Sequence, residues 1–393
     1  MSDGIVIVGA SVAATAFLER ARECSYSGTV TVIDHDLDAP YDRPPLSKAY
    51  LDDGEVESIS VDWDDFSVRF IRAEATGVDL IAREVEAREV GDGATLRVPF
   101  DNLVIASGAQ PARLPFEPQG TVVLRSAADA RALRGCVGEG NTVTIIGAGA
   151  IGVELASSLS RNGVKVTVLD RASGPLERLL GGHLKEEITT WLIEAGVVPR
   201  WDVGIESVRE TDNGWEVALD DGEVISSDIV ISAVGARPAV GWLTESGLLS
   251  DGMLIVDELG AVVTDGQAQR GVYAIGDVAT RFDESGRPSR TESWSAAREQ
   301  GIGLANHLFD SEAEPTGASY FWTEVAGRKV QVVGQVSPTG VVALDSTNPD
   351  RNRALYRVSD ASTDDSWIGV NAQPQIARLL MASMTAPQSD TLS

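Results

Sequence analysis

The residues with the clearest chemical purpose are three glycines in the middle of the chain, Gly147, Gly149 and Gly152. They follow a β-branched apolar run at residues 142–146 and precede an apolar-periodic stretch at 153–162. In this spacing the first glycine permits a tight turn, the second lets a pyrophosphate approach the backbone, and the third lets helix and strand pack closely. The helix that follows offers free N–H groups and the positive end of its dipole to phosphates. The pattern therefore predicts a dinucleotide site.

An acidic residue at the end of the next apolar run supports this interpretation. Asp170 follows residues 165–169 and stands about 20 residues beyond the first glycine, where a carboxylate accepts hydrogen bonds from ribose hydroxyls. That carboxylate favours the free 2′-hydroxyl of NADH over a 2′-phosphate, although the neighbouring Arg171 weakens the repulsion. The alternative is a glycine-rich turn that binds nothing. The residues assigned to NAD are Gly147, Gly149, Ile151, Gly152, Asp170, Arg171 and Gly235.

A degenerate copy of the same turn opens the chain. Residues 4–8 form an apolar run that leads into Gly9, with Ser11 and Ala14 in the second and third glycine positions. The next apolar run, residues 29–33, is followed by Asp34 and Asp36, either of which could accept from a ribose. Two copies in one chain imply two dinucleotides bound together.

The elements that must position these turns are short buried strands and amphipathic helices. Two apolar strands with small residues at their ends, 102–108 and 228–235, are each followed by a proline, so the chain repeats itself about 130 residues on, as in a duplicated domain. We predict an α/β fold with two Rossmann-like dinucleotide-binding domains and a small α+β C-terminal domain beyond Pro315. In that last part we expect strands at 329–333, 340–344 and 354–358, a helix at 374–384 and a frayed tail.

Composition limits the classes of function. The chain has 393 residues, which suits two or three domains, and a net charge of −27, which repels nucleic acid and anionic lipid. Its two cysteines, Cys24 and Cys136, form no CxxC, which argues against a redox dithiol, a disulfide framework or a thiolate-bound cluster. With no secretory signal and no long uncharged apolar run, we expect a cytoplasmic protein.

Residues 40–48 form a proline-rich loop that we expect not to be helical, with Arg43 and Lys48 as its cations. With its motif Tyr-Asp-Arg-Pro-Pro-Leu-Ser-Lys, the chain resembles the putidaredoxin reductase and biphenyl dioxygenase ferredoxin reductase family, FAD-dependent NADH:ferredoxin reductases with a glutathione-reductase-like architecture. The resemblance runs nearly end to end. Supporting motifs lie at residues 147–154, 175–183, 271–277, 292–294, 299–301 and 320–322.

This resemblance implies an NAD domain at 111–237 inserted between two parts of an FAD domain, 1–110 and 238–314. A C-terminal domain, 315–393, would cover the flavin and help dock ferredoxin. Because the spacing from Gly9 matches the family, Asp36 is preferred over Asp34 as the ribose acceptor. The residues implied for FAD are Gly9, Ser11, Ala14, Asp36, Arg43, Lys48, Arg125, Asp277 and Trp294. Lys48, Glu154 and Trp294 would act at the redox site.

The resemblance also implies a mechanism. NADH would deliver a hydride to FAD, with Lys48, held by Glu154, placing a positive charge where the reduced flavin gains electrons. Single electrons would then pass to a small [2Fe–2S] or [3Fe–4S] ferredoxin that serves a cytochrome P450 or a Rieske-type oxygenase. Because ferredoxins are usually acidic, a local cationic patch would have to offset the net charge. The candidates for it are Arg281, Arg287, Arg290, Arg298, Arg328 and Lys329.

Other interpretations stay open at this point. Glu154 could be a solvent-facing residue near a helix N-terminus, and Trp294 could be a packing residue. A flavin disulfide reductase or NADH oxidase would need a flavin-facing thiol, for which Cys24 and Cys136 are poorly placed. An apoptosis-inducing-factor-like flavoprotein shares much of the motif set. A monomer or a weak dimer is expected.

Overall fold

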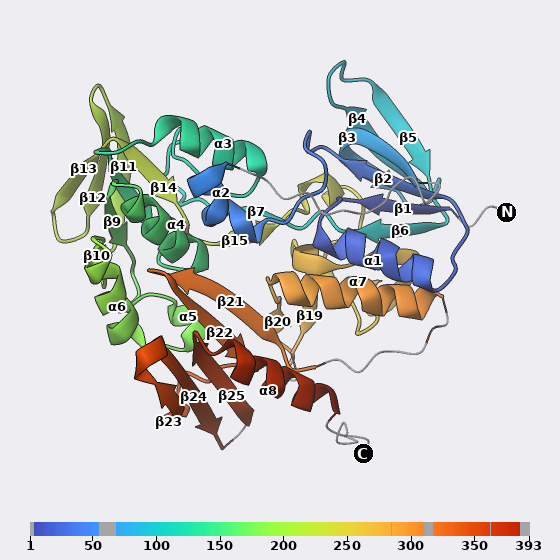
Figure 1. Ribbon diagram of the computed structural model, residues 1–393. Coiled ribbons are helices and arrows are strands. Elements are labelled where there is room, and N and C mark those ends of the chain that lie inside the picture. Colours follow the sequence, from blue (N-terminus) through green and yellow to red (C-terminus); the bar gives the residue numbers. More distant parts are fainter. Residues whose placement is uncertain are drawn as a thin grey trace. The chain divides into compact units, whose positions relative to one another are not determined.

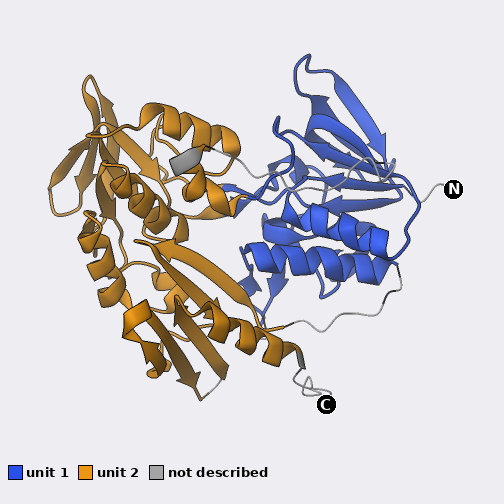
Figure 2. Cartoon of the chain, viewed as in Figure 1, with its two compact units in different colours: residues 1–42, 57–110, 237–314 blue, residues 43–56, 111–236, 315–393 orange. Residues whose placement is uncertain are grey.

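The computed structural model describes residues 4–54, 68–283, 285–309, 311, 317–361 and 363–385. The expected boundary at Pro315 and all but the first residue of the expected tail lie outside these residues. The chain divides into two compact units (Figure 2). Unit 1 comprises residues 1–42, 57–110 and 237–314, and unit 2 comprises residues 43–56, 111–236 and 315–393. The assignment of domains to individual nucleotides stays a prediction.

Unit 1 is built on an eight-stranded sheet in the order β17-β18-β6-β1-β2-β3-β4-β5 (Figure 1). Its central strands β18, β6, β1, β2 and β3 are parallel, so their carboxyl ends meet at one edge. The strands are β1 (Ile5–Val8), β2 (Val30–Asp34), β3 (Val68–Asp79), β4 (Glu84–Glu89), β5 (Thr95–Pro99), β6 (Asn102–Ile105), β17 (Ala261–Thr264) and β18 (Gln267–Ala274). A smaller sheet holds β16 (Leu254–Ile255), β19 (Ala279–Phe282) and β20 (Pro288–Ser289).

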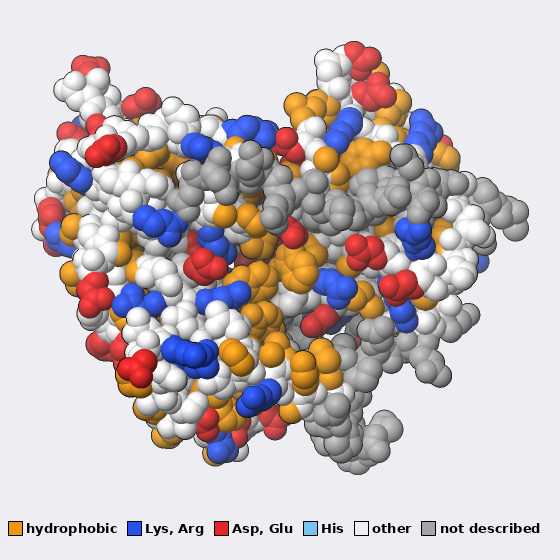
Figure 3. Space-filling view, viewed as in Figure 1, with side chains coloured by type: hydrophobic (Ala, Val, Ile, Leu, Met, Phe, Trp, Pro, Cys, Tyr) orange, Lys and Arg blue, Asp and Glu red, His pale blue; other side chains and the backbone are white. Residues whose placement is uncertain are grey.

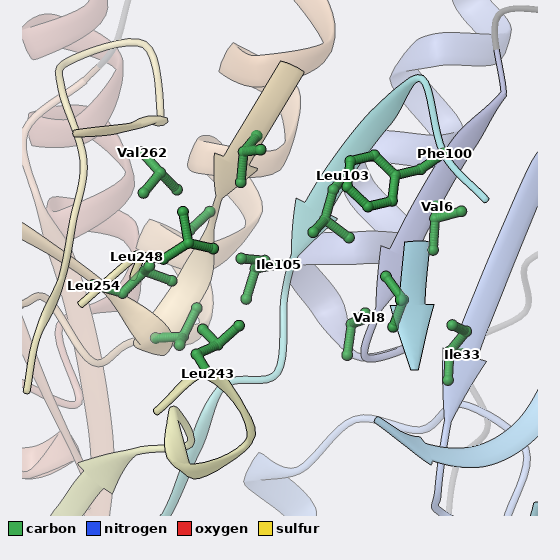
Figure 4. Packing of buried hydrophobic residues seen from close by; sticks show 14 of the residues in the cluster. Val6, Val8, Ile33, Phe100, Leu103, Ile105, Leu243, Leu248, Leu254 and Val262 are labelled. Carbon is green, nitrogen blue, oxygen red and sulfur yellow. The ribbon is translucent and has the colours of Figure 1, made fainter. Parts of the chain in front are cut away.

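The alternation of side chains along β1 divides the core of unit 1 into two layers. Val6 and Val8 point to a cluster with Ile33, Leu103 and Ile105, drawn in Figure 4. The other face of the same strand packs against helices α1 (Val12–Glu23) and α7 (Trp294–Leu308). Burial on both faces explains why the strand is apolar at every position.

Unit 2 repeats this plan in a four-stranded parallel sheet, β10-β9-β8-β14. Strand β8 (Thr142–Ile146) leads into α4 (Ala150–Arg161), as β1 leads into α1. An antiparallel sheet, β11-β12-β13, follows as β3-β4-β5 does in unit 1. The remaining strands are β9 (Lys165–Leu169), β10 (Val198–Arg200), β11 (Ile205–Thr211), β12 (Gly214–Leu219), β13 (Val224–Ser227) and β14 (Ile229–Ser232). The duplication expected from the sequence is therefore present in the strand order.

Between residues 43 and 236, the other helices described in unit 2 are α2 (Ala49–Asp53), α3 (Ala127–Cys136), α5 (Glu177–Leu180) and α6 (Lys185–Glu194). Strands β7 (Ala109–Pro111) and β15 (Ala236–Pro238), where the chain passes between units, form a two-stranded sheet. Short 3₁₀ turns are η1 (Pro44–Ser47), η2 (Gly241–Leu243), η3 (Gly276–Val278) and η4 (Pro349–Arg351). No helix in the described part of the chain is both long and apolar enough to cross a membrane.

The C-terminal part is a five-stranded antiparallel sheet in the order β21-β22-β25-β24-β23. Helix α8 (Gln373–Thr385) packs against it through Ile376, with Leu379 and Leu380 beside the same cluster. The strands are β21 (Tyr320–Val325), β22 (Arg328–Val333), β23 (Val341–Asn348), β24 (Arg353–Asp360) and β25 (Thr363–Val370). The α/β class and the α+β character of this part are confirmed.

Three local expectations were wrong. Residues 44–47 form the 3₁₀ turn η1, because proline is tolerated in the first turn, where its missing N–H is not needed. The apolar pattern of the sequence also predicts a helix over residues 290–308, but α7 begins at Trp294, because the Ser293 hydroxyl accepts from the N–H of Ala296 and caps it. Strands β21 and β25 were not predicted because neither has a clear alternation: β21 begins with three aromatic residues, and β25 begins with four polar ones.

Candidate dinucleotide-binding and redox sites

The glycine turn of unit 2 contains two glycines that the fold requires and one that it does not. A Cβ on Gly147, whose φ is +105°, would lie 2.4 Å from the carbonyl oxygen of Ala233. A Cβ on Gly152 would lie 1.9 Å from the carbonyl oxygen of Gly147. At Gly149 no atom of the described residues lies within 4 Å of that position, and φ is −69°. The fold therefore leaves open space at Gly149, as a cradle for a close-fitting ligand would.

Asp170 stands at the end of β9 beside this turn. One of its carboxylate oxygens accepts from the N–H of Ala148 at 2.5 Å, and the other accepts from Ala172 at 2.8 Å. These bonds fix the carboxylate against the glycine turn while Asp170 stays half-buried. Arg171 is exposed immediately after it, and Ile151 in the first turn of α4 is 41% exposed. The assignment of Arg171 and Ile151 to NAD stays a prediction.

The turn of unit 1 has the same construction. A Cβ on Gly9, whose φ is +102°, would lie 2.3 Å from the carbonyl oxygen of Ala106. Ser11 is the N-cap of α1, and Ala14 in the third glycine position is fully buried. Ala14 therefore contributes packing between the helix and the sheet.

Helices α1 and α4 share a second property. Neither N-cap, Ser11 or Gly149, makes a side-chain hydrogen bond to its helix, and neither first turn contains an acidic residue. Helix α3, in contrast, begins with a complete capping box formed by Ser126 and Asp129. The two glycine-turn helices thus present N–H groups that no side-chain cap occupies, in the arrangement that binds phosphate.

Asp34 and Asp36 take different positions in unit 1. Asp34 accepts from the N–H of Ala10 at 2.9 Å, which makes it the geometric counterpart of Asp170. Asp36 accepts from the hydroxyl of Tyr41 at 2.7 Å, and its backbone carbonyl accepts from Arg72. The preference for Asp36 as ribose acceptor stays a prediction, and the geometry adds Asp34 as a competing candidate.

Asp277 follows β18, whose carboxyl end lies at the same sheet edge as Gly9. The N–H of the preceding Gly276 donates to Gln300 Oε1 at 2.8 Å, so α7 fixes this turn. Trp294, the first residue of α7, is half-buried, and its indole N–H donates to Asp42 Oδ1 at 2.8 Å. Trp294 therefore makes a polar contact with residue 42 of the proline-rich motif, and its place beside a flavin stays a prediction.

Unit 2 holds the predicted pair of Lys48 and Glu154. Lys48 Nζ lies 3.0 Å from Glu154 Oε1 and also donates to the carbonyl oxygen of Pro44 at 3.2 Å. Glu154 is 5% exposed, so the alternative that it faces solvent is wrong. The pairing that the family resemblance implied is present.

Two hydroxyl groups that the sequence did not reveal also donate to Glu154. Thr323 Oγ1 lies 2.6 Å from Oε1, and Ser47 Oγ donates to Oε2. The N–H of Glu324 reaches Oε1 at 3.4 Å. Ser47 lies beside Lys48 in the proline-rich loop at residues 40–48. Thr323, in contrast, is 169 residues from Glu154, and no sequence spacing connects these two residues.

Three other predicted residues lie in unit 2. Arg43 precedes η1, and Arg125 precedes the capping box of α3; both side chains are half-buried. Gly235 has φ of +109°, and its carbonyl oxygen accepts from Ala112. In unit 1 the carbonyl oxygen of Gly108 accepts from Ala239 in the same way. These residues keep their assignments to FAD or NAD as predictions.

Neither of the two cysteines forms a disulfide bond. Cys24 is the C-cap of α1 in unit 1, and Cys136 ends α3 in unit 2; both are free. Partial desolvation raises the pKa of the Cys136 thiol, which lowers its thiolate fraction and so its nucleophilicity.

The cationic candidates are divided between the two units. Arg281, Arg287, Arg290 and Arg298 belong to unit 1, whereas Arg328 and Lys329 belong to unit 2. Arg328 lies 4.8 Å from the Trp191 ring and 3.3 Å from Glu194, so that residue is already engaged. On the face drawn in Figure 3, acidic and basic side chains are interspersed.

The similarities to known proteins agree with this geometry. The benzene 1,2-dioxygenase system ferredoxin–NAD(+) reductase subunit of Pseudomonas putida is 29% identical over 369 residues, covering 92% of this chain and 87% of the relative. The anthranilate 1,2-dioxygenase system ferredoxin–NAD(+) reductase component of Burkholderia cepacia is 31% identical over 341 residues, covering 85% and 82%. The crystal structure of the ferredoxin reductase for the CYP199A2 system from Rhodopseudomonas palustris is 25% identical, with a TM-score of 0.86 over 95% of this chain and 93% of that one.

A family model described as pyridine nucleotide-disulphide oxidoreductase matches residues 3–301, a span that contains both glycine turns. The match covers well over half of the chain. Together with the duplicated strand order and the two uncapped helices, it shows that the chain belongs to the pyridine nucleotide-disulphide oxidoreductase family.

Proposed function

We propose that this protein is an NADH-dependent ferredoxin reductase that uses FAD. The observation that carries the proposal is the pair of glycine turns in one chain, with open space at Gly149 that the fold itself does not need. Two dinucleotides in one oxidoreductase fit a flavin and a nicotinamide. The similar ferredoxin–NAD(+) reductases of dioxygenase systems support the same choice of cofactors and of reaction.

The residues of unit 1 fit FAD. The turn at Gly9 and the uncapped start of α1 would hold the pyrophosphate, and Asp34 or Asp36 the ribose. Asp277 would accept from a hydroxyl of the sugar-like chain. From unit 2, Arg43, Lys48 and Arg125 are proposed to contribute cations. FAD, when bound, supplies the change from two-electron to one-electron chemistry that a ferredoxin requires.

The residues of unit 2 fit NADH. The turn from Gly147 to Gly152 would hold its pyrophosphate, and Asp170 would accept from its ribose. Asp170 already has fixed orientation through its bonds to Ala148 and Ala172. A carboxylate that is fixed beside the ribose favours NADH over NADPH.

Lys48 is the residue we propose to stabilise negative charge on reduction. Its side chain is only 15% exposed, and its ammonium group is directed by Glu154 and Pro44. A preorganised cation in a site shielded from water stabilises developing charge more than a mobile surface lysine does. Glu154 holds Lys48 in place and takes no proton in this scheme.

The proposed electron acceptor is a small iron–sulfur ferredoxin that supplies an oxygenase. The relatives named above carry ferredoxin reductase and dioxygenase in their names. Electrons would leave singly, and docking would depend on local cations and apolar contact, since the net charge of −27 repels acidic partners at long range. A disulfide substrate is disfavoured because neither Cys24 nor Cys136 belongs to a CxxC pair.

Replacement of Gly149 by alanine tests the proposal. The fold has space for the methyl group, so Gly149→Ala should melt at the wild-type temperature. The KM for NADH should rise about tenfold or more, because the methyl group keeps the pyrophosphate away from the backbone, and a tenfold change corresponds to about 1.4 kcal/mol. Gly149 has non-positive φ, so no backbone strain accompanies the change. The protein should still bind FAD and turn yellow.

The matched control is Gly303→Ala, at another glycine with no described atom within 4 Å of its Cβ position. Its KM for NADH should stay at the wild-type value. Steady-state reduction of ferricyanide and of a [2Fe–2S] ferredoxin by NADH provides the assay. A wild-type protein that takes up no FAD, or a Gly149→Ala variant with unchanged KM, would contradict the proposed function.

A further inference from the structure

The carboxylate of Glu154 joins three separate segments of unit 2. Its own helix, α4, begins at the NAD turn. The Ser47 hydroxyl reaches it from the proline-rich motif, and the Thr323 hydroxyl reaches it from β21 in the C-terminal part. Glu154, Ser47 and Thr323 are all at most 5% exposed. Such complete burial means that water cannot replace a donor that is removed.

The two carboxylate oxygens are fixed independently. Oε2 accepts from Ser47, and Oε1 is shared between Lys48 at 3.0 Å and Thr323 at 2.6 Å. A carboxylate held by donors on both oxygens cannot rotate about its terminal torsion. The direction of the Lys48 ammonium group then depends on hydroxyl groups that Lys48 does not touch.

We propose that Thr323 and Ser47 are positioning residues that fix the Lys48 ammonium group through Glu154, which makes strand β21 a working part of the redox site. The redox half of this inference rests on the proposed function, in which Lys48 faces the reduced flavin. The geometric half, that Thr323 directs Lys48, stands on the contacts alone. The C-terminal part therefore contributes more than a cover or a docking surface.

Helix α4 also offers a matched control on the same face. Ser157, one turn beyond Glu154, accepts from the N–H of Ala326 at 2.9 Å and so fastens α4 to the turn that follows β21. It is 8% exposed, and its hydroxyl donates to the carbonyl oxygen of Val153 rather than to Glu154. Ser157→Ala thus loosens the attachment of β21 to α4 without removing a donor to the carboxylate.

The experiment compares Thr323→Val, Thr323→Ser and Ser157→Ala in the full-length holoprotein. Valine keeps the shape of threonine but removes the hydroxyl donor, whereas serine keeps the donor. The first readout is the rate at which an amine-reactive acetylating reagent modifies Lys48, followed by peptide mass spectrometry. The second is the single-turnover rate at which NADH bleaches the flavin absorbance. Thermal melting checks that each variant is folded.

Thr323→Val should raise the acetylation rate of Lys48 several-fold and slow flavin bleaching about tenfold, because hydrogen bonds to charged groups are among the strongest in proteins. Thr323→Ser should return both rates close to the wild-type values. Ser157→Ala should lower the melting temperature about as much as Thr323→Val but leave both rates unchanged. Ser47→Ala should resemble Thr323→Val, since it frees the other oxygen.

Two results would overturn the inference. If Ser157→Ala reproduces the effects of Thr323→Val, the attachment of β21 matters and the hydroxyl donor does not. If Thr323→Val leaves Lys48 acetylation unchanged, Thr323 does not direct Lys48. A wild-type protein that binds FAD but is not bleached by NADH would instead contradict the proposed function, and Lys48 acetylation would still decide the geometric half.

Discussion

The close approach of α1 and α7 in unit 1 depends on Gly301. A Cβ on Gly301 would lie 2.3 Å from the carbonyl oxygen of Ala13 and 3.0 Å from the N of Phe17, both in the backbone of α1. Neither atom can rotate away, so Gly301→Ala must push the two helices apart. Overpacking of a core costs about 1–3 kcal/mol, and contact with backbone belongs at the upper end of that range.

Gly303 on the same helix separates this cost from helix propensity. It is exposed, and no described atom lies within 4 Å of its Cβ position. Alanine is favoured over glycine in a helix interior by about 1 kcal/mol, and this gain applies equally to both variants. The propensity term cancels in their difference, so Gly301→Ala should be less stable than Gly303→Ala by about 2–3 kcal/mol.

Urea unfolding of the two variants, followed by circular dichroism with and without added FAD, measures this difference. Because α1 begins at the Gly9 turn and Gln300 fixes Gly276, Gly301→Ala should also release FAD more readily. Equal stability of the two variants would refute the reasoning. So would a destabilised Gly301→Ala that retains wild-type FAD affinity, because the helix contact would then not support the turns.

Two further predictions concern unit 2. Asp170→Asn should lower the preference for NADH over NADPH, measured as the ratio of kcat/KM values, by about tenfold. The substitution removes the charge that repels a 2′-phosphate, while Arg171 remains. Equal losses with both coenzymes would show that Asp170 serves only the turn. Hydrogen bonds from the backbone N–H and then from the hydroxyl of Thr142 lower the pKa of Asp228 in the folded protein. The ionised carboxylate therefore stabilises the fold at any pH above the pKa of Asp228 in the unfolded chain. This stabilisation disappears as the pH falls through the pKa of Asp228 in the folded protein. Asp228→Asn should therefore be less stable than wild type at pH 7, and the difference should shrink below about pH 4 in pH-dependent urea unfolding; a difference independent of pH would argue against the charge.

The sequence predicted the parts of the fold whose causes are local. The Gly147 turn, the strands around it and the repeated plan follow from residues within about 30 positions of one another, the length of a βαβ unit. In the same way, the Ser293 cap explains where α7 begins, although the apolar pattern alone placed its start too early. Such features depend on backbone geometry, which neighbouring residues set.

The missed features depend on contacts between distant segments. Glu154 shows this most clearly, since its helical position alone was compatible with exposure to solvent. Its burial is caused by Ser47, 107 residues earlier, and by Thr323, 169 residues later. The hydrogen bond from Ala10 gives Asp34 the place that Asp170 has in unit 2, and the choice between Asp34 and Asp36 stays a prediction. Tertiary contacts of this kind leave no periodic pattern in the sequence.

The two glycine turns differ at the one position that the fold does not constrain. Gly147 and Gly9 are both required by a backbone carbonyl close to their Cβ positions, and the third position is filled by glycine or by a buried alanine. At the second position the fold of unit 2 has room for a side chain at Gly149, and unit 1 carries Ser11 at the N-cap of α1 without a side-chain cap bond. Because the fold of unit 2 has room for a side chain at Gly149, we expect the ligand to decide between serine and glycine at this position. Ser11 can offer its hydroxyl to a phosphate oxygen, whereas Gly149 lets a phosphate approach the backbone itself, so the two turns should hold their dinucleotides by different contacts.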